Sequence, residues 1–539
     1  MRNTAALKKF PVFCGIILCM GFLSSCGERA PEILAIYPSI GRMGEPLIIL
    51  GSGFGAQRNE SYVTIAGTPP TSSAYISWSD DEIVVRMPEF ASAGLIRVHR
   101  GRSISNPVLF SNQAALPERV RGEADAGVDP RITSIQPASA PVGSLVTIQG
   151  NNFGSSRDNS AVFFSWNAAG QPADFVEVCG IEFGYEFWSD REIRVRVPDG
   201  AVSGNLKVST IRGDSRPAFF EVAGMPGTRV YRDRRSFLFT SMVDIRVQEA
   251  VSPNALYLWM PRPAVSASQR NIRSVERTTQ PIVENHRGTS LFQFMNVAAQ
   301  ANVGITVSYV VDVYAVETAI TNQNPVNLNA PSPVRTEYTL PSALIPSDSE
   351  EVRALAAQIT GTDRRPYAMA RRIYDWIISS LEFQMEPLSG GVLEALEEGT
   401  VDSYRAALLF CALARASGIP AIPAAGVLVN NLQHTVIHYW AEFWLDGFGW
   451  IPVDPALGSG AAPVGFNLRE DYAAFYFGSM DNQRITFSRG EHSLAQMTPG
   501  GRIVQRIREH SLQNLWEEAA GGLHSYSSLW GNVIITGVF

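Results

Sequence analysis

The stretch "GTVDSYRAALLFCALARASGIPA", Gly399 to Ala421, organises the C-terminal half of this 539-residue chain. Residues 406–414 are apolar on every side, which predicts a helix buried in a core, and Gly418 and Pro420 are typical of residues that end a helix. Ser403 is then expected at the N-terminal end of the helix, where free N–H groups and the helix dipole favour a negative charge. A nucleophile or a developing oxyanion suits such a position.

The following segment, "HTVIHYWAEFWLDGFGWIPVDPALG" (434–458), alternates in the manner of two strands joined by a turn. A three-residue loop, Asp446 to Phe448, would make His438 and Asp454 diagonal neighbours on one face of the hairpin, within side-chain reach. A two-residue loop would place the same two side chains on opposite faces. The register of the hairpin therefore decides whether an imidazole meets a carboxylate.

The motifs "FCALARASGIPA" and "HYWAEFWLDGFGWIPVDP", in this order, resemble the transglutaminase-like superfamily, whose members are relatives of papain-like enzymes with a Cys–His–Asp triad. The clear match covers residues 346–478. The resemblance implies an α+β, papain-like fold in which His438 is the base and Asp454 orients it. The nucleophile position of the family falls on Ser403, and the usual glycine two residues earlier is Val401.

Two classes of function remain open for this domain. In the first, Ser403 is the nucleophile, His438 removes its proton and Asp454 fixes the imidazole, which gives acyl transfer or amide hydrolysis. In the second, the domain is a non-catalytic remnant that binds peptide or glycan, within a scaffold or adhesin-like protein. An alcohol is much less acidic than a thiol, and this favours the second class, while retention of the histidine and the aspartate favours the first.

Two further sets of residues give weaker alternatives. Cys411 lies eight residues after Ser403, about 12 Å along a helix, so we expect a structural core cysteine there. His434 and His438 would be about 13 Å apart on a strand, too far to share a metal ion. We expect neither a metal nor a cofactor.

The N-terminus has the order of an export signal. Arg2, Lys8 and Lys9 precede an apolar run, and "LSSC" ends at Cys26. This arrangement resembles the bacterial lipobox, which implies a signal peptide over 1–25, cleavage before Cys26 and lipid on its thiol. We therefore expect a protein anchored by lipid to the bacterial cell envelope, with the membrane as one partner.

Composition narrows the other partners. The formal net charge is −7, and basic residues do not cluster beyond the first ten residues, which argues against a nucleic acid. The chain has five cysteines, three of them at or before residue 26, so no disulfide framework is predicted. A protein, a peptide or peptidoglycan is the substrate class that the resemblance implies.

An internal repeat lies in the N-terminal part of the chain, between residues 31 and 222. "PEILAIYPSIGRMGEPLIILGSGFG" (31–55) matches "PRITSIQPASAPVGSLVTIQGNNFG" (130–154), and "WSDDEIVVRMP" recurs as "WSDREIRVRVP" with an insertion ahead of it. Both copies resemble the immunoglobulin-like IPT/TIG family. They predict two small β-sandwiches over 31–112 and 130–222, joined by a polar linker over 113–129.

The remaining segments complete a multidomain chain. Strand-like runs predict a third, β-sandwich-like domain over 225–340, and helical spacing begins near residue 346. Residues 479–539 form a C-terminal extension whose last strand we expect to fold back on the transglutaminase-like core. The predicted fold class is two Ig-like sandwiches, a further β-rich domain and an α+β papain-like domain.

Overall fold

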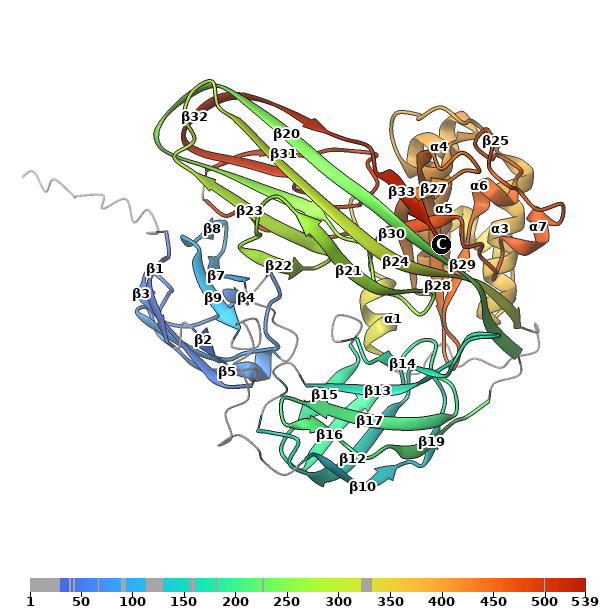
Figure 1. The fold of residues 1–539 in the computed structure, drawn as a ribbon, viewed down its shortest axis with the longest axis horizontal. Helices are drawn as coiled ribbons and strands as arrows, with labels where there is room; N and C mark the ends of the chain where they lie inside the picture. The colour runs from blue at the N-terminus through green and yellow to red at the C-terminus, as the bar shows by residue number, and fades with distance from the viewer. Residues whose placement is uncertain are drawn as a thin grey trace, which may run out of the picture.

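A computed structural model describes residues 30–37, 40–41, 44–65, 67–88, 94–112, 129–155, 157, 160–179, 183–224, 227–320, 332–498 and 500–539. The predicted signal peptide, Cys26 and the predicted linker other than Asp129 lie outside the described residues. Figure 1 shows one β-rich unit at the left, a second along the bottom, a long twisted sheet above them and a mixed helical and β-layer at the right.

The first Ig-like unit consists of two facing sheets, with strand orders β1-β3-β6-β5 and β2-β9-β7-β4. Apolar residues on the inner faces, such as Leu47, Val63 and Ile96, are fully buried, as the alternating pattern predicts. Its elements are β1 (Glu32–Tyr37), β2 (Ile40–Gly41), β3 (Pro46–Ser52), β4 (Tyr62–Ile65), η1 (Ser72–Ala74), β5 (Tyr75–Trp78), β6 (Glu82–Arg86), β7 (Gly94–Arg100), β8 (Ser103–Ile104) and β9 (Val108–Asn112).

The second Ig-like unit repeats this plan and adds one strand. The insertion forms β14 (Asp174–Glu177), which pairs with β13 at the edge of a sheet. The other strands are β10 (Arg131–Gln136), β11 (Ser139–Ala140), β12 (Leu145–Asn151), β13 (Ala161–Trp166), β15 (Tyr185–Trp188), β16 (Glu192–Arg196), β17 (Gly204–Thr210), β18 (Gly213–Asp214) and β19 (Ala218–Val222).

The third domain is a large antiparallel sheet around β20, which runs from Gly227 to Pro261. The strands that close this sheet come from the far end of the chain: β32 and β33 both pair with β20. The last strand was expected to fold back on the transglutaminase-like core. Its Ile535 side chain does pack in one apolar cluster with Val427 and Ile485 of that core, but its backbone pairs with β20. The remaining strands are β21 (Gln269–Arg277), β22 (Val283–His286), β23 (Thr289–Met295), β24 (Asn302–Ile320), β31 (Arg502–Val504), β32 (Glu517–Trp530) and β33 (Ile534–Val538).

The mixed α+β part lies between β24 and β31 in sequence. Its four-stranded sheet has the order β29-β28-β27-β30, and the buried helix α5 packs against β27 and β28. The elements are α1 (Pro333–Tyr338), α2 (Glu350–Thr360), α3 (Pro366–Ser380), β25 (Glu382–Phe383), α4 (Val392–Glu398), β26 (Thr400–Val401), α5 (Ser403–Ala416), β27 (Ala421–Val429), β28 (Thr435–Leu445), β29 (Gly449–Val453), α6 (Pro455–Gly458), α7 (Tyr472–Phe475) and β30 (Arg484–Arg489).

The second Ig-like unit is docked on the β28–β29 hairpin. The loop residue Gly447 donates its N–H to the carbonyl of Val142, at 3.1 Å. Arg229 of β20 pairs with Asp199 and also donates to the Trp450 carbonyl at 2.7 Å, and thereby links this unit to β29. The hairpin is therefore held from outside its own domain.

A second contact joins the same unit to the third domain. The Trp166 ring is almost fully buried and lies between Tyr231 and Tyr314, with ring centroids 5.4 and 5.0 Å away. Arg270 lies over the Trp166 ring at 4.0 Å and pairs with Asp174 of the inserted strand at 3.0 Å. The insertion thus forms part of the contact between domains.

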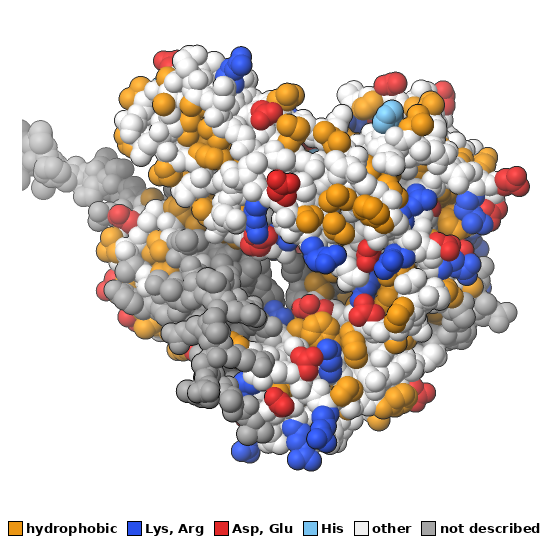
Figure 2. Space-filling view, viewed as in Figure 1, with side chains coloured by type: hydrophobic (Ala, Val, Ile, Leu, Met, Phe, Trp, Pro, Cys, Tyr) orange, Lys and Arg blue, Asp and Glu red, His pale blue; other side chains and the backbone are white. Residues whose placement is uncertain are grey.

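Charged side chains of both signs are interspersed on the face of the molecule shown in Figure 2.

None of the helices in the described ranges combines the length and the apolar character needed to cross a bilayer.

Gly143 provides a test of the docking. Its φ is +86°, and a Cβ added there would lie 2.8 Å from Cζ2 of Trp444. We expect Gly143→Ala to lower the free energy of unfolding by about 2–4 kcal/mol, because backbone strain and a clash with an inter-domain ring add together. Urea denaturation of the full chain measures this loss.

Gly170→Ala is the matched control, since Gly170 lies in the same unit at φ +73° with nothing within 4 Å of the added Cβ. It should cost only the strain of a left-handed alanine, about 1 kcal/mol. Equal losses for the two variants would show that the Trp444 contact does not form.

Candidate active site

The hairpin has the three-residue loop. Leu445 pairs with Gly449 and Ala441 pairs with Val453, so Asp446, Gly447 and Phe448 form the connection. This confirms the register on which the meeting of His438 and Asp454 depended.

His438 and Asp454 are in direct contact. Nε2 of His438 lies 2.8 Å from Oδ2 of Asp454, and the two residues are 4% and 0% exposed. A carboxylate can only accept, so Nε2 carries the hydrogen and donates it. The described hydrogen bonds include none from Nδ1 of His438, and this nitrogen is left as the basic atom of the ring.

Arg484 of β30 completes this buried group. Nη1 of Arg484 donates to the same Oδ2 of Asp454 at 3.0 Å, and Nη2 donates to Asp481 at 2.7 Å. Its guanidinium also lies 4.9 Å from the centre of the Trp440 ring. Asp454 is thus held from two sides, by the imidazole and by the guanidinium.

These contacts decide the ionisation of Asp454. Burial alone would raise the pKa of this carboxyl. The adjacent His438, Arg484 and Leu457 N–H together lower the pKa by more than burial raises it, so the net pKa lies below its usual value. The Leu457 N–H donates to Oδ1 at 3.0 Å, because Asp454 is also the N-cap of α6. A charged carboxylate without water is stable only with such partners.

Ser403 is the first residue of α5, as the sequence predicts. The end of this helix already holds a carboxylate, because Oδ1 of its N-cap Asp402 accepts the Arg405 N–H at 2.8 Å. Oδ2 of Asp402 pairs with Arg508 from the C-terminal extension. The helix terminus is therefore partly neutralised before any substrate arrives.

One aromatic contact joins the serine end of α5 to the histidine strand. Tyr404 and Tyr439, each the next residue after Ser403 and His438, pack edge to face with centroids 5.0 Å apart. The described hydrogen bonds include none from the Ser403 side chain. The structure therefore joins His438 and Asp454 directly and leaves Ser403 at the adjoining helix end, with no bond to the imidazole.

The apolar core around α5 contains two further residues considered in the sequence, Val401 and Cys411. Val401 and Cys411 are both fully buried in the cluster around α5. Burial raises the pKa of Cys411 to about 12, which makes its thiol inert at neutral pH. Cys411 is a core residue, as expected.

Arg484, Asp481 and Arg508 were missed in the sequence. The first two lie just beyond residue 478, where the clear motif match ends, and the third lies further along the C-terminal extension, which shows no periodic pattern. The short spacing "DNQR" (481–484) puts an aspartate and an arginine together, but nothing local indicates that they face Asp454. Within the described residues, no group of three or more His, Cys, Asp or Glu side chains is placed to hold a metal ion.

Comparisons with known proteins agree with this arrangement. The family profile of the transglutaminase-like superfamily matches residues 353–455, and that of the IPT/TIG domain matches 31–111 and 130–222. An "Uncharacterized protein" of Haemophilus influenzae is 26% identical over 260 residues, which span 42% of this chain and 69% of that protein.

The similar solved structures are distant. A chain from Cytophaga hutchinsonii, named a "Putative Cysteine Protease", covers 58% of this chain and 92% of itself at 16% identity, with a TM-score of 0.38. The SGBP-B protein from a xyloglucan utilization locus of Bacteroides uniformis covers 53% of this chain and 99% of itself at 13% identity, with a TM-score of 0.14. At these scores we draw no argument from either. From the matches to the family profiles we conclude that the chain carries two IPT/TIG domains followed by a transglutaminase-like domain.

Proposed function

We propose that this chain is a lipid-anchored protein of the bacterial cell envelope whose transglutaminase-like domain catalyses acyl transfer or amide hydrolysis with Ser403 in place of cysteine. The observation that carries the proposal is the buried His438–Asp454 pair, in which Nε2 is bonded and Nδ1 is left as the base. A protein, a peptide or peptidoglycan supplies the amide.

In this reaction Oγ of Ser403 attacks the amide carbonyl carbon while Nδ1 of His438 takes the hydroxyl proton. The tetrahedral intermediate collapses, the C–N bond breaks and the imidazolium returns the proton to the leaving amine. Water or a second amine then attacks the acyl-serine, which gives hydrolysis or transfer. Asp454 holds the ring and stabilises the imidazolium in both halves.

The rate of this chemistry is expected to be low. A serine hydroxyl does not form the ready ion pair that a thiol forms with imidazole. The carboxylate of Asp402, one residue away, opposes the developing charge on Ser403, and the paired Arg508 offsets part of this effect.

A second function has its own support. Ser403 makes no hydrogen bond to His438, and a carboxylate already caps the helix that would stabilise an oxyanion. These features favour a domain that binds peptide or glycan without turnover, in a scaffold or adhesin-like lipoprotein.

The substitution Ser403→Cys separates the two functions. In a soluble form starting at residue 30 with Cys179→Ser, only the inert Cys411 remains as a natural thiol. If His438 faces position 403, the new thiol should have a pKa below the ordinary value of about 8.5 and react with iodoacetamide about tenfold faster at pH 7 than free cysteine. Mass spectrometry of the alkylated peptide gives the rate.

Ser417→Cys is the matched control, since Ser417 lies at the opposite end of the same helix and is also half-buried. Its thiol should react slowly, and His438→Ala should slow only the thiol at position 403. If position 403 reacts like position 417 whether or not His438 is present, the enzyme proposal fails and the binding function replaces it.

The role proposed for Arg484 is to hold Asp454 charged and in place. Arg484→Met should lower the free energy of unfolding by about 3–5 kcal/mol, because the buried carboxylate of Asp454 and the partly buried carboxylate of Asp481 each lose a cationic partner. Because the pKa of Asp454 is lower in the folded protein, its charged carboxylate stabilises the fold above pH about 4, and this stabilisation is lost as the pH falls. Arg484→Met removes one cause of the lowered pKa, so the variant should unfold at a higher pH than the unmodified protein in an acid titration.

Arg469→Met is the control for Arg484→Met. Arg469 pairs with Asp471 at the surface, where both side chains are about half exposed, so the cost should be below about 1 kcal/mol. Similar losses for the two variants would contradict a special role for Arg484.

Lipidation is tested at Cys26, outside the described residues. Cys26→Ala should abolish labelling of the expressed protein by a fatty-acid probe and leave a product that is either uncleaved or soluble, because no thiol remains to carry the acyl chain. Cys19→Ala is the control and should label normally. Labelling of the Cys26→Ala protein would remove the anchor from the proposal.

A further inference from the structure

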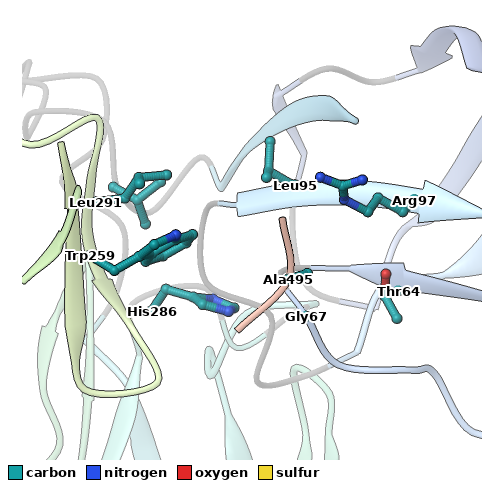
Figure 3. Close-up of a pocket in the computed structure, with 9 residues that line it drawn as sticks. Thr64, Gly67, Leu95, Arg97, Trp259, His286, Leu291 and Ala495 are labelled. Atoms are coloured by element: carbon teal, nitrogen blue, oxygen red, sulfur yellow. The ribbon is translucent and has the colours of Figure 1, made fainter. Parts of the chain in front are cut away.

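A small cavity lies between the first Ig-like unit and the third domain. Figure 3 shows Trp259, His286 and Leu291 of the third domain facing the strands that carry Thr64, Leu95 and Arg97. The cavity volume is about 20 Å³, which holds one species the size of a water molecule or a halide ion.

Arg97 of β7 is the charged residue of this cavity. Its side chain is only 3% exposed, and Nε and Nη2 are both buried without a hydrogen-bond partner. These two nitrogens form one edge of the guanidinium, the edge that binds an anion with two parallel N–H bonds. On the facing wall of the cavity, Trp259 is 3% exposed, and its Nε1 is also a buried donor without a partner.

The second copy of the repeat shows that Arg97 in the first copy lacks a carboxylate partner. Lys207 of β17 occupies the position of Arg97 in the second Ig-like unit, and its Nζ pairs with Asp214 of β18 at 2.7 Å. Asp214 lies opposite Ser209, and the corresponding residue opposite His99 in the first unit is Ile104. The first unit therefore keeps the cation of the repeat but has lost its carboxylate.

The residues around Arg97 do not replace that carboxylate. Glu518 is the carboxylate whose charge acts on Arg97. Its two oxygens accept hydrogen bonds from the N–H groups of Met497 and Thr498, each at 2.5 Å. His286 is 5% exposed, and burial lowers its pKa to about 3, so it is neutral at pH 7 and offers no counter-charge. A fully buried guanidinium edge without an acceptor is strongly disfavoured.

We propose that this cavity binds one small inorganic anion of halide size, held by Nε and Nη2 of Arg97. The anion lies between the two domains, because Arg97 belongs to the first Ig-like unit and the facing wall of the cavity, with Trp259 and Leu291, belongs to the third domain. Leu95, next to Arg97 on the same face of β7, packs against the apolar cluster that contains Trp259 and Leu291. Binding of the anion therefore strengthens the docking of the first unit.

Chloride tests the site in the full chain. At a fixed ionic strength of about 0.15 M, replacing gluconate with chloride should raise the midpoint of thermal unfolding in a saturable manner by about 2 °C or more. Gluconate screens charge equally but is too large for the cavity. Arg97→Met should abolish the chloride response, and Glu518→Gln should shift it to lower chloride concentration by removing a competing negative charge.

Lys207→Met is the matched control, because Lys207 has the same place in the repeat but its own carboxylate partner. It should keep the full chloride response. Equal midpoints in chloride and gluconate for the unmodified chain, or an unchanged response in Arg97→Met, would overturn the proposal.

A second measurement does not depend on the variants folding. Crystals of the unmodified chain soaked in bromide should show an anomalous peak within hydrogen-bonding distance of Nε and Nη2 of Arg97. Ordinary water density without an anomalous signal would mean that the cavity holds only solvent, and the proposal would be withdrawn.

Discussion

A loop of three residues, Asp446 to Phe448, determines which face of the sheet Asp454 joins. With this loop the carboxylate meets the imidazole of His438. Arg484 of β30, in the same sheet, donates a hydrogen bond to the same carboxylate oxygen. One residue more or less would turn every side chain after the loop to the other face. The pair, its tautomer and the charge of Asp454 all follow from this register.

The register does not rest on the hairpin alone. Gly447 of the loop donates a hydrogen bond to the Val142 carbonyl, and the Trp450 carbonyl of β29 accepts one from Arg229. The second Ig-like unit and the third domain therefore hold the two strands in place. An Ig-like unit is often a passive spacer. Here it acts as a support for the residues proposed to be catalytic, and changes in it can reach the site through the backbone.

Local patterns were enough to predict some of this from the sequence. The apolar run of α5 gave the position of Ser403, and alternation with turn chemistry gave the hairpin and its loop. The repeat of prolines and glycines indicated two sandwiches. The contacts of Arg484 with Asp454 and of Trp166 with Tyr314 could not be predicted, because they join segments far apart in sequence whose spacing carries no period. The backbone pairing of β33 with β20 was not predicted for the same reason, since an edge strand pairs through backbone groups that all sequences share.

The third domain encloses the transglutaminase-like domain in sequence: β24 precedes it and β31, β32 and β33 follow it. Phe237 of β20 pairs with Val538, some three hundred residues later, so this sheet has an open edge until almost the whole chain has been made. Pairings of such long range form slowly, and an unpaired edge is a template for aggregation. A chain that ended before β32 would therefore lack two strands of the third-domain sheet, although it would keep every residue proposed to be catalytic.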